Sequence, residues 1–119
     1  MRVLNFALNS ELEELRSRAA KVAADGVEKF GRFTDSWMNG YSSEFSEIMA
    51  SEGWIGMSWP KEHGGQERSA IERVIVGEEM ISAGAPIAGM WFADRQMGPS
   101  LIAHGTPQQQ EEYLPGILS

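Results

Sequence analysis

The chain has 119 residues, 10 basic against 17 acidic side chains, and no cysteine. This length suits one domain, and the lack of cysteine excludes disulfides, thiolate nucleophiles and Cys-ligated metal centres. A net charge of −7 with scattered basic residues disfavours nucleic-acid binding. The longest uncharged run, residues 80–93, is shorter than the about 20 residues that a membrane span needs. Residues 1–8 lack the pattern of a signal peptide, so we expect a soluble, cytoplasmic protein.

A long helix is predicted to open the domain. Ser10 followed by Glu13 has the spacing of a capping box. Apolar residues then recur on one helical face at steps of three and four: Leu12, Leu15, Ala19, Val22, Ala23, Val27, Phe30 and Phe33. We expect this helix to fade over residues 34–39 and the segment to end at Gly40.

A second, shorter helix is predicted over residues 42–51, with Gly53 as its stop. The stretch 54–65 contains two tryptophans, Pro60 and the pair Gly64-Gly65, which is typical of an irregular loop. Because large aromatic side chains are costly to leave in water, we expect this loop to pack against the body of the domain.

Two further helices are predicted after the loop. Ser69 and Glu72 form a second capping box, which begins a helix that ends at Gly84. Pro86 suits the first turn of the next helix, residues 86–96. Gly98-Pro99 is then expected to interrupt the helical run before a short segment that ends at Gly105.

The last helix is predicted over residues 108–114, with Thr106 as N-cap, Pro107 at the first position and Pro115 as the stop. No segment shows the two-residue alternation of a strand. We therefore predict an all-α fold, with five to six helices in an antiparallel up-and-down bundle and a single domain over residues 1–119.

The side chains by themselves point to no catalysis. His63 and His104 are the only imidazoles, and because they are far apart in the chain we expect structural roles for both and no metal site. Glu78 and Glu79 are adjacent in a predicted helix and point about 100° apart, which favours ion pairing over a two-carboxylate site. The cluster Met90-Trp91-Phe92 is compatible with a flexible apolar pocket or with plain core.

Four motifs occur in a fixed order. They are Gly53-Trp54-Ile55-Gly56, then residues 59–65 (W-P-K-E-H-G-G), then Gly77-Glu78-Glu79-Met80, then residues 105–110 (G-T-P-Q-Q-Q) with Tyr113-Leu114-Pro115. In this order and spacing they resemble the N-terminal helical domain of acyl-CoA dehydrogenases, although Lys61 and His63 depart from the residues common there. The stretch 93–99 (A-D-R-Q-M-G-P) is similar to a bacterial subgroup. Some of its members act on bulky or ring-bearing acyl-CoAs, including steroid side-chain thioesters, and some are two-gene heteromers.

The resemblance implies that the whole protein is a flavoprotein oxidoreductase of lipid metabolism and fatty-acid β-oxidation. It would use FAD to desaturate an acyl-CoA thioester to a trans-2-enoyl-CoA, pass the electrons to an acceptor and work as a homo- or hetero-oligomer. In the family a middle β-domain and a C-terminal helical bundle supply the flavin site and the catalytic glutamate. We therefore expect no catalytic and no cofactor-binding residue in residues 1–119, and no activity from the chain alone.

The N-terminal domain of that family supplies one wall of the acyl pocket. The positions of this chain that match the wall are Ala88, Gly89, Phe92 and Gln96, with plain core as the other interpretation of Phe92. A second hypothesis is a stand-alone helical module that stabilises a partner dehydrogenase subunit. The identity and length of the acyl group and the electron acceptor stay open at this point.

Overall fold

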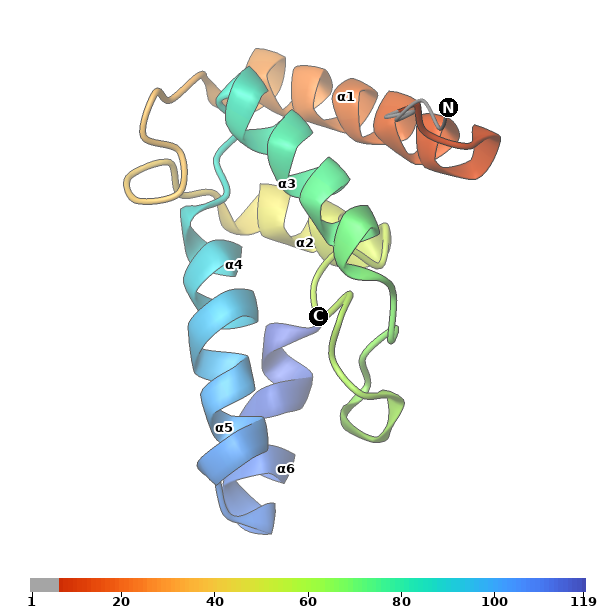
Figure 1. Cartoon of the computed structure of the whole chain (residues 1–119). Coiled ribbons are helices and arrows are strands. Elements are labelled where there is room, and N and C mark those ends of the chain that lie inside the picture. The colour runs from red at the N-terminus through yellow and green to blue at the C-terminus, as the bar shows by residue number, and fades with distance from the viewer. Residues whose placement is uncertain (1–6) are drawn as a thin grey trace.

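The computed structural model describes residues 7–119, and in that range the regular structure is helical throughout (Figure 1). The α-helices are α1 (Ser10–Phe30), α2 (Ser43–Ser51), α3 (Ala70–Ala83), α4 (Ala88–Phe92), α5 (Gly98–His104) and α6 (Pro107–Ile117). A 3₁₀ turn, η1 (Lys61–His63), lies in the loop before α3, and a π-helical turn, η2 (Ala93–Met97), joins α4 to α5. Because η2 leaves no break, α4, η2 and α5 form one continuous helix. The predicted all-α class with five to six helices is confirmed.

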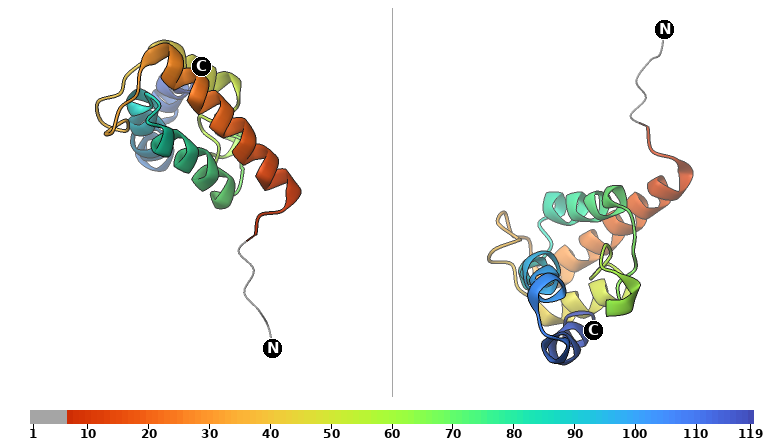
Figure 2. Two further views of the ribbon diagram at one scale, coloured as in Figure 1. Left: turned by 90° about the horizontal axis from the view of Figure 1, so that it is seen from above. Right: turned by 60° about the horizontal axis from the view of Figure 1, so that its bottom comes forward.

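The chain reverses direction from α1 to α2, from α2 to α3 and from α5 to α6, whereas α4 continues into α5 (Figure 1). α2 runs back beneath α1, and α6 folds back beside α5 (Figure 1). α1 and α3 lie side by side and run the same way, as two views show (Figures 1 and 2). Their C-terminal ends are joined where the Phe33 N–H donates to the Gly84 carbonyl at 2.9 Å.

The core lies where α1, α2, α3 and α4 meet. Its buried members come from all four helices, from the loop before α3 and from the connection between α3 and α4: Ala19, Val22, Ala23, Phe45, Met49, Trp54, Ile55, Met57, Val76, Met80, Ala85, Ile87 and Met90. Gly26 serves this packing, because a Cβ there would overlap the ring of Phe45. The Phe45 ring also meets Phe30 edge to face, with 6.1 Å between the ring centroids.

Two of the predicted helix starts are formed as expected: Ser69 and Glu72 make their capping box at α3, and Thr106 caps α6. Gln109 completes a capping box at α6 that was not predicted, and Ser42, predicted as the first residue of its helix, instead caps α2. The prediction for α1 was wrong by one residue. Asn9, and not Ser10, is the N-cap, and its side chain accepts from the Leu12 N–H at 2.9 Å. α1 also ends earlier than predicted, at Phe30, because Gly31 turns the chain with φ 98°.

Prolines account for the other differences from the predicted helices. Pro86 does not lie in a helix, because α4 begins only at Ala88. The Ala88 N–H donates to the Gly40 carbonyl, which holds the connection between α3 and α4 against the loop before α2. Pro115 does not stop α6, which continues to Ile117. A proline in a last turn removes one hydrogen bond, and burial of the neighbouring Leu114 and packing of Ile117 against the core favour the helix.

Pro99 does not interrupt the helix either, because the chain passes into a π-helical turn just before it. In an α-helix the Gly98 N–H would donate to the Asp94 carbonyl. Here it donates to the Ala93 carbonyl, one residue further back. The Asp94 carbonyl instead accepts from the indole Nε1 of Trp59 at 3.0 Å. The backbone groups around Pro99 are thus satisfied without ending the helix.

The loop 52–69 packs against the domain, as the sequence predicted from its tryptophans. Trp54 and Trp59 are both buried. Residues 56–59 pair with residues 66–68 through the backbone, including Gln66 N–H to Gly56 carbonyl at 3.1 Å. Among residues 7–119 no helix has the length and apolar content needed to cross a bilayer.

We predict that Gly98→Ala destabilises the domain by about 1–3 kcal/mol, because a Cβ at Gly98 would overlap the buried ring of Trp59 and a well-packed core resists added volume. Gly116→Ala is the matched control. No atom lies within 4 Å of a Cβ added there, so we expect a gain of about 0.5–1 kcal/mol from helix propensity. Urea unfolding of both variants tests this. An unchanged midpoint for Gly98→Ala would contradict the packing described for Trp59.

Candidate functional site

A groove of about 600 Å³ lies between the α4–α5 helix, α2 and α6. Its walls are mostly apolar, with a few hydroxyls and one carboxylate: Tyr41, Ser43, Ser46, Glu47, Ile55, Gly89, Met90, Ala93, Met97, Leu101, Tyr113, Gly116, Ile117 and Ser119. A concave apolar surface of this size with a few polar groups is the usual form of a site for a small organic ligand.

The continuous helix formed by α4, η2 and α5 is called the long helix from here on. Small residues on it give the groove its depth. Gly89 and Ala93 lie on the wall, and Met97 and Leu101 continue the same face through the π-helical turn. A Cβ added to Gly89 would lie 3.0 Å from the ring of Tyr41, so this ring already covers the glycine. Tyr41, Met97 and Tyr113 are all more than half exposed, which leaves large apolar side chains in water at the rim.

The structure separates the four residues that the sequence pointed to. Gly89 lines the groove. Ala88 is buried, and its N–H donates to the Gly40 carbonyl. Phe92 and Gln96 are exposed, and neither lines the groove. The sequence placed Ala88, Phe92 and Gln96 on one face by a spacing of four, but the π-helical turn changes that spacing from Ala93 onward.

Most of the groove could not be found from the sequence. Tyr41 lies in the loop before α2, and Tyr113 and Ile117 lie on α6. They reach the long helix only through the tertiary fold. The one sequence signal was the pair of small residues in the apolar stretch 88–93, because small residues in a helix often mark a close approach of another group.

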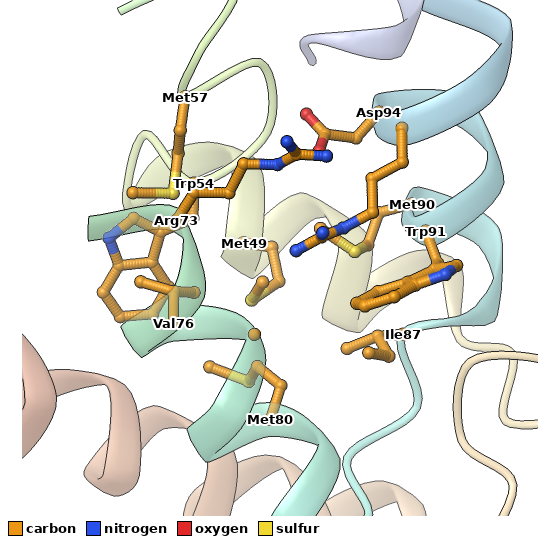
Figure 3. Close-up of a pocket in the computed structure, with 12 residues that line it drawn as sticks. Met49, Trp54, Met57, Arg73, Val76, Met80, Ile87, Met90, Trp91 and Asp94 are labelled. Atoms are coloured by element: carbon orange, nitrogen blue, oxygen red, sulfur yellow. The ribbon is translucent and has the colours of Figure 1, made fainter. Parts of the chain in front are cut away.

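A second cluster of functional groups lies on the other side of the long helix, toward α3 (Figure 3). Asp94 is 6% exposed, and its carboxylate accepts from the Gly56 N–H. Arg73 on α3 points toward the Asp94 carboxylate (Figure 3). Burial raises the pKa of Asp94 above its ordinary value of 3.8, against the opposing effects of the Gly56 hydrogen bond and of the charges on Arg73 and Arg95. The sequence analysis missed this cluster.

Glu78 and Glu79 share one ion-pair partner. The sequence predicted ion pairing for carboxylates that point apart, but both meet the same guanidinium on α1: Arg16 lies 3.2 Å from Glu78 and 2.6 Å from Glu79.

The two histidines lie in different elements. His63 lies in the 3₁₀ turn and His104 ends α5. Within residues 7–119 no three His, Asp or Glu side chains gather in a way that suits a metal ion.

The glycine pair of the W-P-K-E-H-G-G motif has a structural role in the loop. A Cβ on Gly65 would overlap the carbonyl of Trp59, and Gly64 has φ 84°. Both glycines therefore allow the tight turn that carries Trp59 into the core, and neither is aimed at a phosphate group.

Comparison with known proteins shows the relationship of this chain. Residues 9–119 match the family described as "Acyl-CoA dehydrogenase, N-terminal domain". The chain belongs to the acyl-CoA dehydrogenase family. The all-α fold agrees with this membership.

The family relatives include several dehydrogenases of actinobacteria. The chain is 39% identical over 71 residues to the acyl-CoA dehydrogenase FadE26 of Mycobacterium tuberculosis, covering 60% of this chain and 17% of that protein. It is 38% identical over 116 residues to a 3-sulfinopropanoyl-CoA desulfinase of Cupriavidus necator, covering 96% of this chain and 29% of that protein. This acyl-CoA dehydrogenase domain thus spans less than a third of the length of these relatives.

Two solved structures have the same fold over nearly the whole chain. One is the Tcur3481-Tcur3483 steroid acyl-CoA dehydrogenase, with a TM-score of 0.75, 32% identity, and 98% of this chain and 30% of that chain covered. The other is the ChsE4-ChsE5 complex of Mycobacterium tuberculosis, with a TM-score of 0.75, 28% identity, and 97% of this chain and 29% of that chain covered. The second is described as a complex of two proteins.

We predict that Asp94 makes folding less favourable as pH rises. Its pKa is raised in the folded chain, so between about pH 3.8 and that raised pKa the folded state holds more protons than the unfolded state. The free energy of unfolding then falls with rising pH, by at most about 1.4 kcal/mol per pH unit for one group. Asp94→Asn removes this titration and keeps an oxygen that accepts from Gly56.

The measurement is the free energy of unfolding of both proteins from pH 3.5 to pH 7. The free energy of unfolding of the wild type minus that of Asp94→Asn should decrease as pH rises through this window. The contributions of the other carboxylates are the same in both proteins and cancel in the difference. A difference that increases with pH would show that Arg73 and Arg95 outweigh burial and lower the pKa of Asp94.

Proposed function

We propose that this chain is the N-terminal domain of a flavin-dependent acyl-CoA dehydrogenase and forms one wall of its acyl pocket. The whole protein would remove an α-proton and a β-hydride from an acyl-CoA thioester and release a trans-2-enoyl-CoA. The observation that carries the proposal is the groove over Gly89, Ala93 and Met97, on the helix that the sequence resemblance assigns to the acyl pocket.

The groove suits a substantial acyl group. Its volume of about 600 Å³ lies within the range of small-molecule sites, and the lining is largely apolar. Gly89 and Ala93 leave space on the helix, while Tyr41 and Tyr113 add flat aromatic surfaces at the rim. A bulky or ring-bearing acyl group would use that width. This agrees with the printed description of one structural neighbour as a steroid acyl-CoA dehydrogenase.

Ala88 supports this wall from within the core, whereas Phe92 and Gln96 do not line the groove. Ala88 is buried under Gly40 and sets the distance between the helix and the loop before α2. Phe92 and Gln96 are exposed on the helix, so contact with an acyl group would require further polypeptide that covers their face.

FAD supplies the hydride-accepting chemistry when it is bound to the whole enzyme. The glycine pair of this chain is taken up by the turn at Trp59, and the resemblance to the family implies that residues outside this chain would hold the flavin. We assign no catalytic residue, no cofactor ligand and no metal ligand to this chain. Acyl-CoA and an electron acceptor would be partners of the whole enzyme.

A second candidate is a stand-alone helical subunit that stabilises a separate dehydrogenase. Its support is that the ChsE4-ChsE5 neighbour is described as a complex of two proteins. The two candidates make different predictions about the gene. An open reading frame that continues past codon 119 favours the first, and a stop codon there favours the second.

The decisive experiment is to express the complete reading frame and ask whether FAD copurifies. The first proposal expects a yellow protein whose flavin is bleached by an acyl-CoA thioester in the absence of oxygen. A complete protein that binds no flavin would overturn it. If the frame ends at residue 119, the second proposal expects the chain to copurify with a flavoprotein dehydrogenase when both are coexpressed.

In the complete enzyme, Gly89→Leu should raise KM for thioesters of bulky acids by about tenfold, because it fills the groove beneath Tyr41. KM for a short straight-chain thioester should change little. Ser100→Leu adds the same side chain at an exposed position of α5 outside the groove and serves as the control. Steady-state kinetics with paired long and short thioesters provide the test. An equal loss with both would mean that Gly89 does not border the acyl group.

A further inference from the structure

Two arginines beside the long helix lack the carboxylate partners that other arginines of the domain have. Arg16, Arg18 and Arg68 each form an ion pair with a glutamate. Within residues 7–119 the side chains of Arg73 and Arg95 form no hydrogen bond and no ion pair at contact distance, although both lie close enough to Asp94 for their charges to act on its pKa.

Arg95 is held in a fixed position despite this lack of a partner. Its guanidinium lies over the ring of Trp91, 3.9 Å from the ring centroid. Its Nε is fully buried and has no hydrogen-bond acceptor. On α3, Gly77 leaves room for it, since a Cβ there would lie 3.0 Å from Nη2. Burial lowers the pKa of Arg95, and the nearby charge of Arg73 lowers it further.

The nearby carboxylate is already engaged. Asp94 accepts from the Gly56 N–H, and Arg73 points toward it (Figure 3). Two guanidinium groups therefore face one carboxylate, which leaves a net positive charge next to Trp91. A half-buried cation without an acceptor is costly unless another anion completes the site.

A hollow of about 390 Å³ opens from Arg95 to the surface between α3 and the long helix. Its walls are Val74, Gly77, Glu78, Ile81, Ser82, Trp91 and Arg95. Val74 and Ile81 are exposed, as is Ile71 at the start of the same helix, whereas Ile75, Val76 and Met80 are buried. Glu78, the acidic residue among them, is largely exposed and shares Arg16 with Glu79. The hollow thus combines apolar walls with one unpaired guanidinium and, at its solvent side, one carboxylate.

We propose that this hollow binds a carboxylate that is attached to an apolar body. Arg95 takes the carboxylate through its planar set of N–H donors, and Trp91, Val74 and Ile81 contact the apolar body. The positive charge of Arg73 balances the negative charge of Asp94, so the positive charge of Arg95 is left without a counter-charge of its own. The carboxylate is either that of a free apolar acid or that of a glutamate between apolar residues on another polypeptide.

The site shares no residue with the groove and requires neither flavin nor thioester. Its test therefore succeeds or fails independently of the proposed dehydrogenase activity.

The experiment follows the indole N–H resonance of Trp91 in the ¹⁵N-labelled chain, assigned by its loss in Trp91→Phe. Hexanoate represents the free acid, and the peptide acetyl-Leu-Glu-Leu-amide represents the protein side chain. Hexanamide and acetyl-Leu-Gln-Leu-amide are the matched neutral ligands. We expect saturable shifts with at least one acid, with a Kd of about 1 mM as is usual for ligands of this size, and no saturation with the amides.

Arg95→Gln should weaken binding of the acid by about tenfold or more, because it removes a charge-assisted hydrogen bond. Arg32→Gln removes the same charge at an exposed site that borders neither the groove nor the hollow, and it should leave Kd unchanged. If Arg95→Gln does not fold, the comparison of acid with amide on the wild-type chain still decides the question.

Saturation by hexanoate supports the site and identifies a free acid as sufficient. Saturation by the glutamate peptide alone supports the site and identifies a protein side chain as its ligand. The proposal is overturned if neither acid saturates the shift, if the amides bind as well as the acids, or if folded Arg95→Gln binds as tightly as the wild type.

Discussion

The contact between Trp59 and the π-helical turn determines how the second half of the domain is arranged. The indole Nε1–H of Trp59 donates to the Asp94 carbonyl, and the Asp94 carboxylate accepts from the Gly56 N–H. The ring itself lies against the backbone of Gly98, where no side chain would fit. Two polar contacts and one steric contact thus bind the loop 52–69 to one turn of the long helix. Because the loop leads directly into α3, this attachment also sets where α3 lies relative to α4.

The predictable parts of this fold depend on neighbours in the sequence. Ser69 with Glu72 and Thr106 with Gln109 begin helices through hydrogen bonds that span three residues, so a short sequence window contains all the necessary information. The apolar stripe of α1 was predictable for the same reason. The order of helices and the class of the fold follow from such local signals.

The unpredicted parts depend on partners far away in the chain. From its neighbours in the sequence, Pro99 is expected to stop a helix. The π-helical turn releases the Asp94 carbonyl, and its new donor is Trp59, 35 residues away in the chain. A short sequence window does not contain this donor. The groove has the same character. Gly89 was identified from the helix that carries it, whereas Tyr41 and Tyr113 come from other elements. The sequence analysis gave Arg95 no role of its own, because neither its stacking on Trp91 nor the missing acceptor is visible in the sequence.

The π-helical turn also explains how one helix serves two different surfaces. Gly89, Ala93 and Met97 face the groove, whereas Trp91 and Arg95 face the hollow beside α3. In a regular α-helix, residues eight apart are rotated by about 80° from one another, so Gly89 and Met97 would not share a wall so closely. The wider turn reduces this rotation and keeps Met97 over the groove. Asp94, at the centre of the same turn, is directed inward to the loop. A substitution that restored regular α-helical bonding at residues 93–98 would therefore move both surfaces at once and release Trp59, although it touched neither the groove nor the hollow.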